Sequence, residues 1–514
     1  MHDKLYAFNL FTKIVICIFE WIKVILNLKL IKLTKMKKNN SQAKTSKQTE
    51  SLLAKVHSKK AKVAIVGVGY VGLPVAAMLA QAGFAATGVD VNVDRIDKLK
   101  RGGNPIEGNE PGLNELLAQA CRTGRLQFTT SSEVYRSSDI ILIAVETPVE
   151  DGDHKPKYKA LRSAVEAIAK QVKSEKSKVK SKEVMVIVES TIAPGTINNI
   201  VRPTLEKITG RKEGKDLFVI NCPERLMPGF LIKKIRHHSR VVGAASKKAA
   251  KIANEFYRNI IAYQPKHPDF QWRGEIDVAT NLEAEIVKTA ENAHRDVQIA
   301  FANELAWICE EYGADFWRVR HLVRKSPERN IHEAGAGVGG HCIPKDSWLL
   351  LASVLKHHKH SVIAHARHLN DEGPHHIYEF LKQAAHENKL SMKKIRVAVM
   401  GVTYNADSDD TRNAPTDVLI KLLKKAGVHY HLHDPYVSHL KKMKAESILK
   451  SAQAAIFMVA HSKYRGLQPK KIAKQMKAPK IIIDGRNIFS REKMESAGLK
   501  YWGVGNKKCL SPNI

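Results

Sequence analysis

Apolar and polar positions from Lys62 onward are grouped in a way that predicts a layered α/β domain. The stretch "KVAIVGVGYVGLPVAAMLAQAGFAATGVDVN" contains a short β-branched run, a glycine turn, an Ala/Leu-rich helix and a second apolar run that ends at Asp90. Short apolar runs follow at 139–145, 184–188 and 217–220, with helical segments between them. Because alternating strands and helices are typical of parallel sheets, we expect a first domain at 61–243.

A helical segment separates this domain from a second α/β region. Residues 281–312 contain no Gly or Pro and keep apolar residues at helical spacing, which predicts one long buried helix closed by Gly313. It belongs to a predicted central helical domain at 244–390. Residues 391–514 then begin again with strand, turn and helix, and a strand that ends at Asp434. The predicted fold class is α/β, with two Rossmann-like parallel-sheet domains flanking a central helical domain.

Residues 1–60 are predicted to form a basic, partly apolar extension. The apolar pattern of the first 35 residues is interrupted by Lys13, Glu20, Lys23 and Lys29, whereas a transmembrane helix needs about 20 mostly uncharged residues. A secretory cleavage site is also missing from the pattern. Three interpretations stay open: an interfacial amphipathic helix, a disordered extension, or a start-codon artefact upstream of Met36. Membrane contact is expected only if this segment is real.

Charge and cysteine content narrow the class of partner. The formal net charge is +33, and residues 1–62 carry 14 lysines against three acids. The remaining charge is dispersed and aromatic residues make up only 6%, so we expect no nucleic-acid partner, although a positive field suits anionic metabolites. The six cysteines form no CxxC pair or Cys/His cluster. This argues against a disulfide framework or a metal and favours a reducing, cytoplasmic location.

The glycine motif "GVGYVG" predicts a dinucleotide site. Gly67, Gly69 and Gly72 follow a predicted strand and open a predicted helix, where they permit a tight turn, approach of the backbone to a pyrophosphate and close helix packing. Asp90 would accept hydrogen bonds from ribose hydroxyls and repel a 2′-phosphate, which favours NAD over NADP. A simple packing turn is the alternative, but it would not require Asp90.

A second set of residues suggests covalent chemistry. Cys342 lies in "GVGGHCIPKD", before Lys345 and Asp346, and nearby lysine can help a thiol to ionise. Lys288 and Asn292 are four residues apart on the long helix and share a face. An inert buried cysteine and a lysine that reaches solvent are the alternatives. NAD together with an activated cysteine is the combination that oxidises an aldehyde through a thiohemiacetal and a thioester, so the pair points to a dehydrogenase.

Several motifs in the same order resemble the UDP-glucose/GDP-mannose dehydrogenase family over about 62–510. They are "VGVGYVGLP", "ESTIAPGT", "CPERLMPG", "AEIVKTAENAHRDVQIAFANELA", "GVGGHCIPKD" and "DDTRNAP". The resemblance implies a four-electron oxidation of a nucleotide sugar at C6, from alcohol to carboxylate, with two NAD used in succession. It also implies a homodimer or higher homo-oligomer, with the middle helices forming the interface.

The resemblance implies a role for each matching residue. Cys342 would attack the intermediate aldehyde, Lys288 would stabilise the oxyanion, and Asn292 would position Lys288 or the sugar. Asp346 and Thr191 would bind and activate water, and Glu224 would lie at the sugar. The implied cofactor residues, beyond the three glycines and Asp90, are Tyr70, Val71, Arg95, Thr147 and Arg412. The implied substrate residues, beyond Glu224, Lys288 and Asn292, are Arg225, Arg329 and Gly339.

The chain also departs from the family pattern. Pro228 stands where UDP-glucose dehydrogenases have a second glutamate, which favours UDP-N-acetylmannosamine as substrate over UDP-glucose or UDP-N-acetylglucosamine. Glu146 and Ser347 occupy positions where proline is common, and Asn405 replaces a common lysine. Two alternatives remain open: a two-electron oxidoreductase in which Cys342 is only structural, and a non-catalytic nucleotide-sugar-binding protein.

Overall fold

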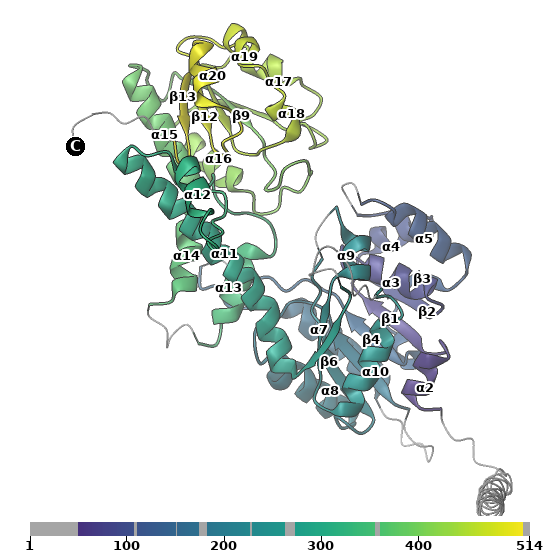
Figure 1. The fold of residues 1–514 in the computed structure, drawn as a ribbon. Coiled ribbons are helices and arrows are strands. Elements are labelled where there is room, and N and C mark those ends of the chain that lie inside the picture. The colour runs from purple at the N-terminus through teal and green to yellow at the C-terminus, as the bar shows by residue number, and fades with distance from the viewer. Residues whose placement is uncertain are drawn as a thin grey trace, which may run out of the picture. The chain divides into compact units, whose positions relative to one another are not determined.

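Two parallel-stranded sheets and a set of middle helices make up the computed structural model of the chain (Figure 1). It describes residues 50–106, 110–150, 152–173, 182–226, 229–262, 273–354 and 360–506. The described part of the predicted extension, 50–60, contains helix α2 (Leu52–His57), whose Leu52 and Val56 are buried in the first core. Residues 1–49, with the three interpretations of them, lie outside the described residues.

The first lobe, residues 50–279, contains an eight-stranded sheet in the order β3-β2-β1-β4-β5-β6-β7-β8. Its first six strands are parallel and have the doubly wound order 3-2-1-4-5-6. The strands are β1 (Lys62–Val66), β2 (Ala85–Val89), β3 (Leu126–Thr129), β4 (Ile140–Ile143), β5 (Val184–Val188), β6 (Leu217–Asn221), β7 (Arg240–Gly243) and β8 (Ile276–Ala279). β7 is antiparallel to β6 and parallel to β8, so the sheet takes its last strand from beyond residue 243, the predicted end of the first domain.

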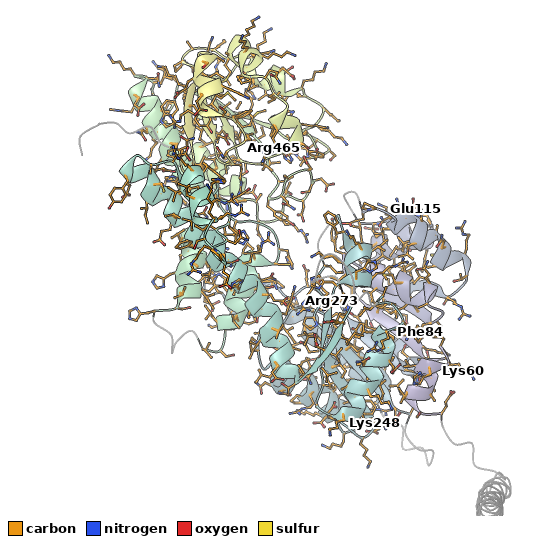
Figure 2. All side chains as sticks on the ribbon, in the orientation of Figure 1. Lys60, Phe84, Glu115, Lys248, Arg273 and Arg465 are labelled. Carbon is orange, nitrogen blue, oxygen red and sulfur yellow. The ribbon has the colours of Figure 1, made fainter. Side chains whose placement is uncertain are left out.

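Buried apolar strands explain why this sheet forms. Every residue of β4, β5 and β6 is buried, as expected for strands covered by helices on both faces. Phe84, labelled in Figure 2, is fully buried beside Phe256, with ring centroids 5.6 Å apart. The helical turns of this lobe, after α2, are α3 (Gly72–Gln81), α4 (Val93–Lys100), α5 (Leu113–Arg122), α6 (Val134–Ser137), α7 (Lys159–Val172), η1 (Ile197–Val201), α8 (Arg202–Thr209), α9 (Leu231–His237) and α10 (Lys247–Tyr257).

The long helix α11 (Asn281–Tyr312) begins and ends where the sequence predicts. Thr280 and Glu283 form a capping box at its start, and Gly313 ends it with a φ of 73°. The expectation that it is buried holds for one face only: Phe301 is 54% exposed and Tyr312 is 74% exposed in the single chain. The other middle helices are α12 (Phe316–Val323), α13 (Ile343–Leu351), α14 (Val362–Asp371) and α15 (Gly373–Glu387).

The second lobe, residues 396–506, contains a parallel sheet in the order β10-β9-β11-β12-β13. Its elements are β9 (Arg396–Met400), α16 (Pro415–Lys425), β10 (His429–His433), α17 (Ala445–Leu449), β11 (Ala454–Phe457), α18 (Ser462–Arg465), α19 (Pro469–Gln475), β12 (Ile481–Asp484), α20 (Arg491–Ser496) and β13 (Lys500–Gly503). The predicted fold class, two Rossmann-like sheets flanking a helical segment, is confirmed. The predicted boundaries between the domains stay predictions.

Two features are absent from the described ranges. None of their helices combines the length and the apolar character that a membrane crossing needs. Within the same ranges, His, Cys, Asp and Glu side chains do not gather in groups of three or more that could hold a metal ion.

Candidate active site

The glycine turn between β1 and α3 is shaped by backbone contacts that exclude side chains. Gly67 has a φ of +87°, and a Cβ there would lie 2.7 Å from the carbonyl oxygen of Ala144. A Cβ on Gly72 would lie 1.9 Å from the carbonyl oxygen of Gly67, whereas a Cβ on Gly69 would meet no atom within 4 Å. The turn is thus tightly packed at Gly67 and Gly72 and open at Gly69. Tyr70 and Val71 follow Gly69, and Val71 is the N-cap residue of α3.

Asp90 lies at the carboxyl end of β2 and is almost fully buried. Its Oδ2 accepts hydrogen bonds from the backbone N–H of Val68 at 3.0 Å and from Arg95 at 2.9 Å, and Oδ1 accepts from the N–H of Asn92 at 2.9 Å. The glycine turn has no side chain at Gly69, so it leaves room for the pyrophosphate of NAD. The acid at the end of the next strand, Asp90, fits the ribose. The arrangement brings Arg95 to Asp90, where a bound ribose would lie.

The second lobe repeats part of this frame. Gly401 has a φ of +97° and donates its N–H to the carbonyl of His433, and Val402 donates its N–H to Oδ2 of Asp434 at 2.9 Å. In the first lobe Gly67 likewise donates its N–H to the carbonyl of Val89, and Val68 donates its N–H to Oδ2 of Asp90. The two lobes differ in the side chain that binds the acid, which is Arg95 at Asp90 and His461 at Asp434.

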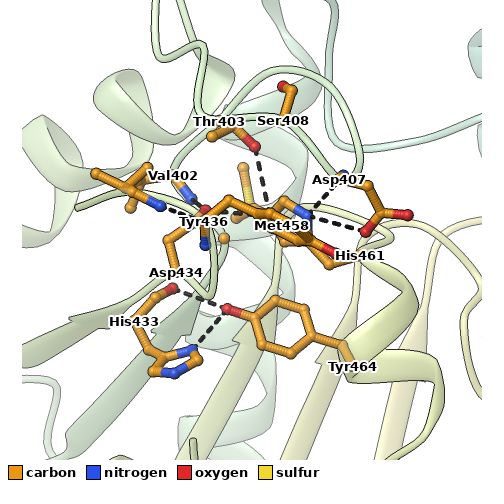
Figure 3. Close-up of polar contacts among 12 residues, drawn as sticks. Val402, Thr403, Asp407, Ser408, His433, Asp434, Tyr436, Met458, His461 and Tyr464 are labelled. Carbon is orange, nitrogen blue, oxygen red and sulfur yellow. Dashed lines mark hydrogen bonds and ion pairs between the residues drawn. The ribbon is translucent and has the colours of Figure 1, made fainter. Parts of the chain in front are cut away.

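In the second lobe the imidazole of His461 contacts the acid at the end of the strand, Asp434 (Figure 3). His461 follows the end of β11 by four residues, as Thr147 follows the end of β4. Its Nε2 lies 3.1 Å from Oδ2 of Asp434, and its Nδ1 accepts the backbone N–H of Asp407 at 2.9 Å. Since Nδ1 accepts, Nε2 carries the proton and donates it to Asp434. A fully buried imidazole therefore binds the acid of the second lobe, whereas Arg95 binds the acid of the first lobe.

Cys342 is the residue immediately before α13, and its carbonyl accepts the N–H of Asp346 at 2.9 Å. Burial raises the pKa of the thiol to about 11, and the charges of Asp346 and Glu224 act in the same direction. The charges of Lys288 and Lys345 oppose them and favour the thiolate. The thiol thus lies among four charged side chains, two of each sign.

Lys288 is buried on α11. Burial acts to lower its pKa, but the negative charges of Glu224, Asp346 and Cys342 outweigh this effect, so that the pKa is raised. The interpretation of Lys288 as a side chain that reaches solvent is wrong, because it is buried and faces three acidic groups. A charged ammonium group held in this position can bind an oxyanion.

Asp346 is fully buried and held by two side chains. Asn292 donates its Nδ2 to Oδ2 of Asp346 at 2.6 Å, and Lys345 donates its Nζ to Oδ1 at 2.6 Å. Asn292 comes from α11, whereas Asp346 and Lys345 come from the first turn of α13. Asn292, which we expect to position Lys288 or the sugar, thus bonds directly to Asp346.

Glu224 and Thr191 follow neighbouring strands of the first sheet. Glu224 comes shortly after β6, and its N–H donates to the carbonyl of Glu189, which follows β5. Thr147 donates its hydroxyl to the carbonyl of Thr191 at 2.5 Å. Since the carboxyl ends of parallel strands meet at one edge of the sheet, these residues lie at the edge where open α/β sheets bind ligands.

The other predicted substrate residues differ in their surroundings. Arg225 forms a bidentate pair with Glu291 of α11, at 2.6 and 3.0 Å. Arg329 is exposed in the loop between α12 and α13, and no contact with the Cys342 group is seen within the described residues. The predicted role of Arg329 stays a prediction, and Pro228 lies outside the described residues.

The loop before Cys342 packs against the second lobe. A Cβ on Gly339 would lie 2.6 Å from Cβ of Tyr404, and Gly340 donates its N–H to the carbonyl of Arg412 at 3.1 Å. Arg412 forms a bidentate pair with Asp410 and places its guanidinium 5.1 Å from the ring centre of Tyr70. The loop of the second lobe thus touches both the glycine turn and the cysteine loop.

The sequence reasoning missed two buried groups. In the first, Oε1 of Glu189 accepts from Tyr257 at 2.6 Å and from Arg240 at 3.1 Å, beneath Glu224. The second surrounds Asp296 on α11 and is described below. Neither has a motif spacing, because the partners are far apart in the sequence. The one available signal for the second group was a charged residue, Asp296, on a helix that the sequence predicts to be buried.

Family models match three consecutive parts of the chain. Residues 61–261 match the NAD binding domain of the UDP-glucose/GDP-mannose dehydrogenase family, residues 282–372 its central domain and residues 398–491 its UDP binding domain. The chain belongs to this family. The resemblance predicted from the motifs is confirmed, and the dehydrogenase has the NAD-type domain that its glycine turn indicates.

Relatives of this dehydrogenase carry names of related activities. A UDP-N-acetyl-D-mannosamine dehydrogenase of Pyrococcus horikoshii is 33% identical over 444 residues, which are 86% of this chain and 99% of the relative. An NDP-N-acetyl-D-galactosaminuronic acid dehydrogenase of Ralstonia nicotianae is 30% identical over 84% of this chain and 97% of the relative. A solved structure of the P. horikoshii UDP-D-ManNAc dehydrogenase superposes with a TM-score of 0.78, covering 87% of this chain and 100% of that one.

Proposed function

We propose that the protein oxidises C6 of UDP-N-acetylmannosamine from alcohol to carboxylate, with two NAD used per sugar. The observation that carries the proposal is the convergence of Lys288, Asp346 and Glu224 on the Cys342 thiol. The names of two relatives support an acetamido sugar, as does Pro228 in place of the second glutamate. The third matched segment, 398–491, would bind the nucleotide part of the substrate.

Bound NAD supplies a hydride acceptor, and a four-electron oxidation needs it twice. The chain supplies the remaining chemistry. The sulfur of Cys342 would form a bond to C6 at the aldehyde stage while its proton passes to the aldehyde oxygen, and Cys342 would hold the sugar as a thioester after the second oxidation. Lys288 would stabilise the negative oxygen that forms on C6, because its ammonium group is buried and stays charged.

Release of the product would depend on Asp346 and Thr191. Water adds to the thioester carbonyl, the C–S bond breaks, and Cys342 leaves as a thiolate. Asp346 would accept the proton of the attacking water, since Asn292 and Lys345 fix both of its carboxylate oxygens in place. A reducing compartment keeps a catalytic thiol free, so the proposal includes a cytoplasmic location.

The proposal includes a homodimer formed through α11. Five large apolar side chains at helical spacing are exposed along the described helix: Leu282, Ile286, Phe301, Ile308 and Tyr312. An exposed apolar stripe of this length is typical of a helix that packs against another subunit.

The test is the number of NADH formed per nucleotide sugar consumed. Purified protein is offered UDP-N-acetylmannosamine, UDP-N-acetylglucosamine, UDP-glucose and GDP-mannose in turn, together with Cys342→Ser and, as a matched control, the exposed Cys121→Ser. We expect two NADH per UDP-N-acetylmannosamine, loss of uronate in Cys342→Ser and no change in Cys121→Ser. A single NADH with an unaffected Cys342→Ser would make the protein a two-electron oxidoreductase, and no turnover would leave a binding protein.

A further inference from the structure

A fully buried polar group lies beside the proposed active site without belonging to it. Asp296 is on α11, one turn after Asn292. Its Oδ2 accepts the hydroxyl of Ser347 at 2.9 Å, and its Oδ1 accepts Arg367 at 2.6 Å and Asn370 at 2.7 Å. All four side chains are completely buried.

The placement of these bonds couples α11 to α13. Asn292 and Asp296 occupy successive turns of α11, and they bind the consecutive residues Asp346 and Ser347 of α13. Two bonds one helical turn apart fix both the rotation and the axial position of α13 against α11. Because Asp346 lies in the first turn of α13, these bonds set the position of its carboxylate.

Stability alone does not account for this group. Removing an aspartate and an arginine from water costs free energy, and replacing such pairs by apolar residues is often neutral or stabilising. The pair here is further fixed by Asn370, which also donates to the carbonyl of Asp296 at 2.9 Å, and by Asp371, which accepts from Arg367 at 2.8 Å. The group thus defines one orientation of the Asp296 carboxylate, the one that faces Ser347.

We propose that Asp296 is a positioning residue that acts through Ser347 on Asp346. It holds the carboxylate of Asp346 in the orientation that receives the proton of water as the thioester is hydrolysed. In that step the C–O bond to water forms, the C–S bond to Cys342 breaks, and sulfur leaves as a thiolate. The inference rests on the proposed function, because it concerns the last step of the same reaction.

The test uses Ser347→Ala in the full chain, which removes one hydroxyl and leaves Asn292 and Lys345 on Asp346. In a single turnover with UDP-N-acetylmannosamine, we expect both NADH to form at nearly the wild-type rate. Hydrolysis should slow by about 10- to 100-fold, since a displacement of about 1 Å costs up to that much. The covalent adduct on Cys342 would then accumulate and be visible by intact-protein mass spectrometry, while KM for the sugar changes little.

The matched control is Thr209→Ala at the end of α8. Like Ser347→Ala it removes one buried hydroxyl, which donates to the carbonyl of Leu205 at 2.6 Å, and Thr209 makes no side-chain hydrogen bond to the Asp296 group in the described part of the chain. We expect it to lower the melting temperature without accumulation of the adduct. Asp296→Asn is the second variant, should Ser347→Ala not fold, and it should give the same adduct.

The outcomes separate the two proposals. Wild-type protein that forms one NADH per sugar, or none, overturns the proposed function and with it this inference. Wild-type protein that forms two NADH, together with a folded Ser347→Ala or Asp296→Asn that releases uronate at the wild-type rate, overturns the positioning role alone. Equal accumulation of the adduct in Thr209→Ala would also overturn it, because the effect would then follow from lost stability.

Discussion

The thiol of Cys342 is poised by competing charges rather than by a simple base. With its pKa raised to about 11, roughly one thiol in ten thousand is ionised at pH 7. The burial that raises the pKa also removes water from the site, which strengthens the attraction between a thiolate and Lys288 once the proton has left. Low resting reactivity and strong stabilisation of later charged species therefore have the same cause.

The first prediction concerns the pH dependence of alkylation at Cys342. With iodoacetamide, the rate of modification of Cys342 should rise about tenfold per pH unit between pH 7 and 10, because only the thiolate reacts. Asp346→Asn removes a negative charge and should shift the curve to lower pH, whereas Lys288→Met should shift it to higher pH. Peptide mass spectrometry follows Cys342 separately, and Cys121 in the same samples serves as the control. Curves that do not move would contradict this account of the charges.

The second prediction compares two glycines of the same turn. Gly72→Ala places a Cβ 1.9 Å from the carbonyl oxygen of Gly67, so α3 must move, and we expect a loss of about 1–3 kcal/mol of stability. Gly69→Ala meets no atom within 4 Å and should leave the melting temperature unchanged. Both should weaken NAD binding, measured by titration calorimetry. Equal melting temperatures for the two variants would contradict the packing argument.

At the scale of elements, α11 anchors the first lobe through a buried carboxyl. Glu285 accepts the N–H groups of Gly195 at 2.6 Å and Ile197 at 2.7 Å, at the start of η1. Burial raises its pKa from 4.5 to about 7. Between pH 4.5 and about 7 the folded protein thus keeps a proton on Glu285 that the unfolded chain releases. The resulting contribution to the free energy of unfolding is fully present below about pH 4.5 and is lost as the pH rises through about 7.

The third prediction follows from that sign. Between pH 5.5 and 8.5 the wild type should lose about 2 kcal/mol that Glu285→Gln does not lose, so the melting temperature of the variant should depend less on pH. The exposed Glu283→Gln on the same helix is the control, because its pKa is lowered and it does not titrate in this range. Parallel pH profiles for the wild type and Glu285→Gln would count against the assignment.

The fourth prediction concerns the contact between His461 and Asp434 in the second lobe. His461→Ala leaves the buried carboxylate of Asp434 without its imidazole partner, and we expect a loss of about 2–4 kcal/mol. Millimolar imidazole should restore part of the melting temperature by occupying the vacated space. The exposed His431→Ala should show neither the loss nor the recovery. A His461→Ala variant as stable as the wild type would mean that the imidazole contributes little.

Local signals explain which elements the sequence could predict. The bounds of α11 follow from Thr280, Glu283 and Gly313, which are adjacent to the helix they limit. β8 escaped prediction because its side chains are half exposed and its partner β7 adds to the sheet through a single antiparallel pair, Asn221 with Gly243. The bond from Ser347 to Asp296 spans 51 positions, and no spacing rule could have indicated it.

At the scale of the whole molecule, the exposed stripe on α11 leads to the fifth prediction. Phe301→Glu should convert a dimer to a monomer in light scattering, because a charge would be buried in an apolar interface. Lys251→Glu on the exposed side of α10 introduces the same side chain outside the stripe and should leave the mass unchanged. A wild type that is already monomeric, or a Phe301→Glu variant that stays dimeric, would exclude this interface.

The contact between His461 and Asp434 has a practical consequence for the whole molecule. A single ring supports a loop whose Tyr404 packs on the glycines before Cys342. If that ring is supplied from solution instead of by the chain, the stability of the second lobe becomes dependent on an added compound. Turnover of a His461→Ala variant would then rise with the concentration of a small heteroaromatic molecule, which would act as an external control.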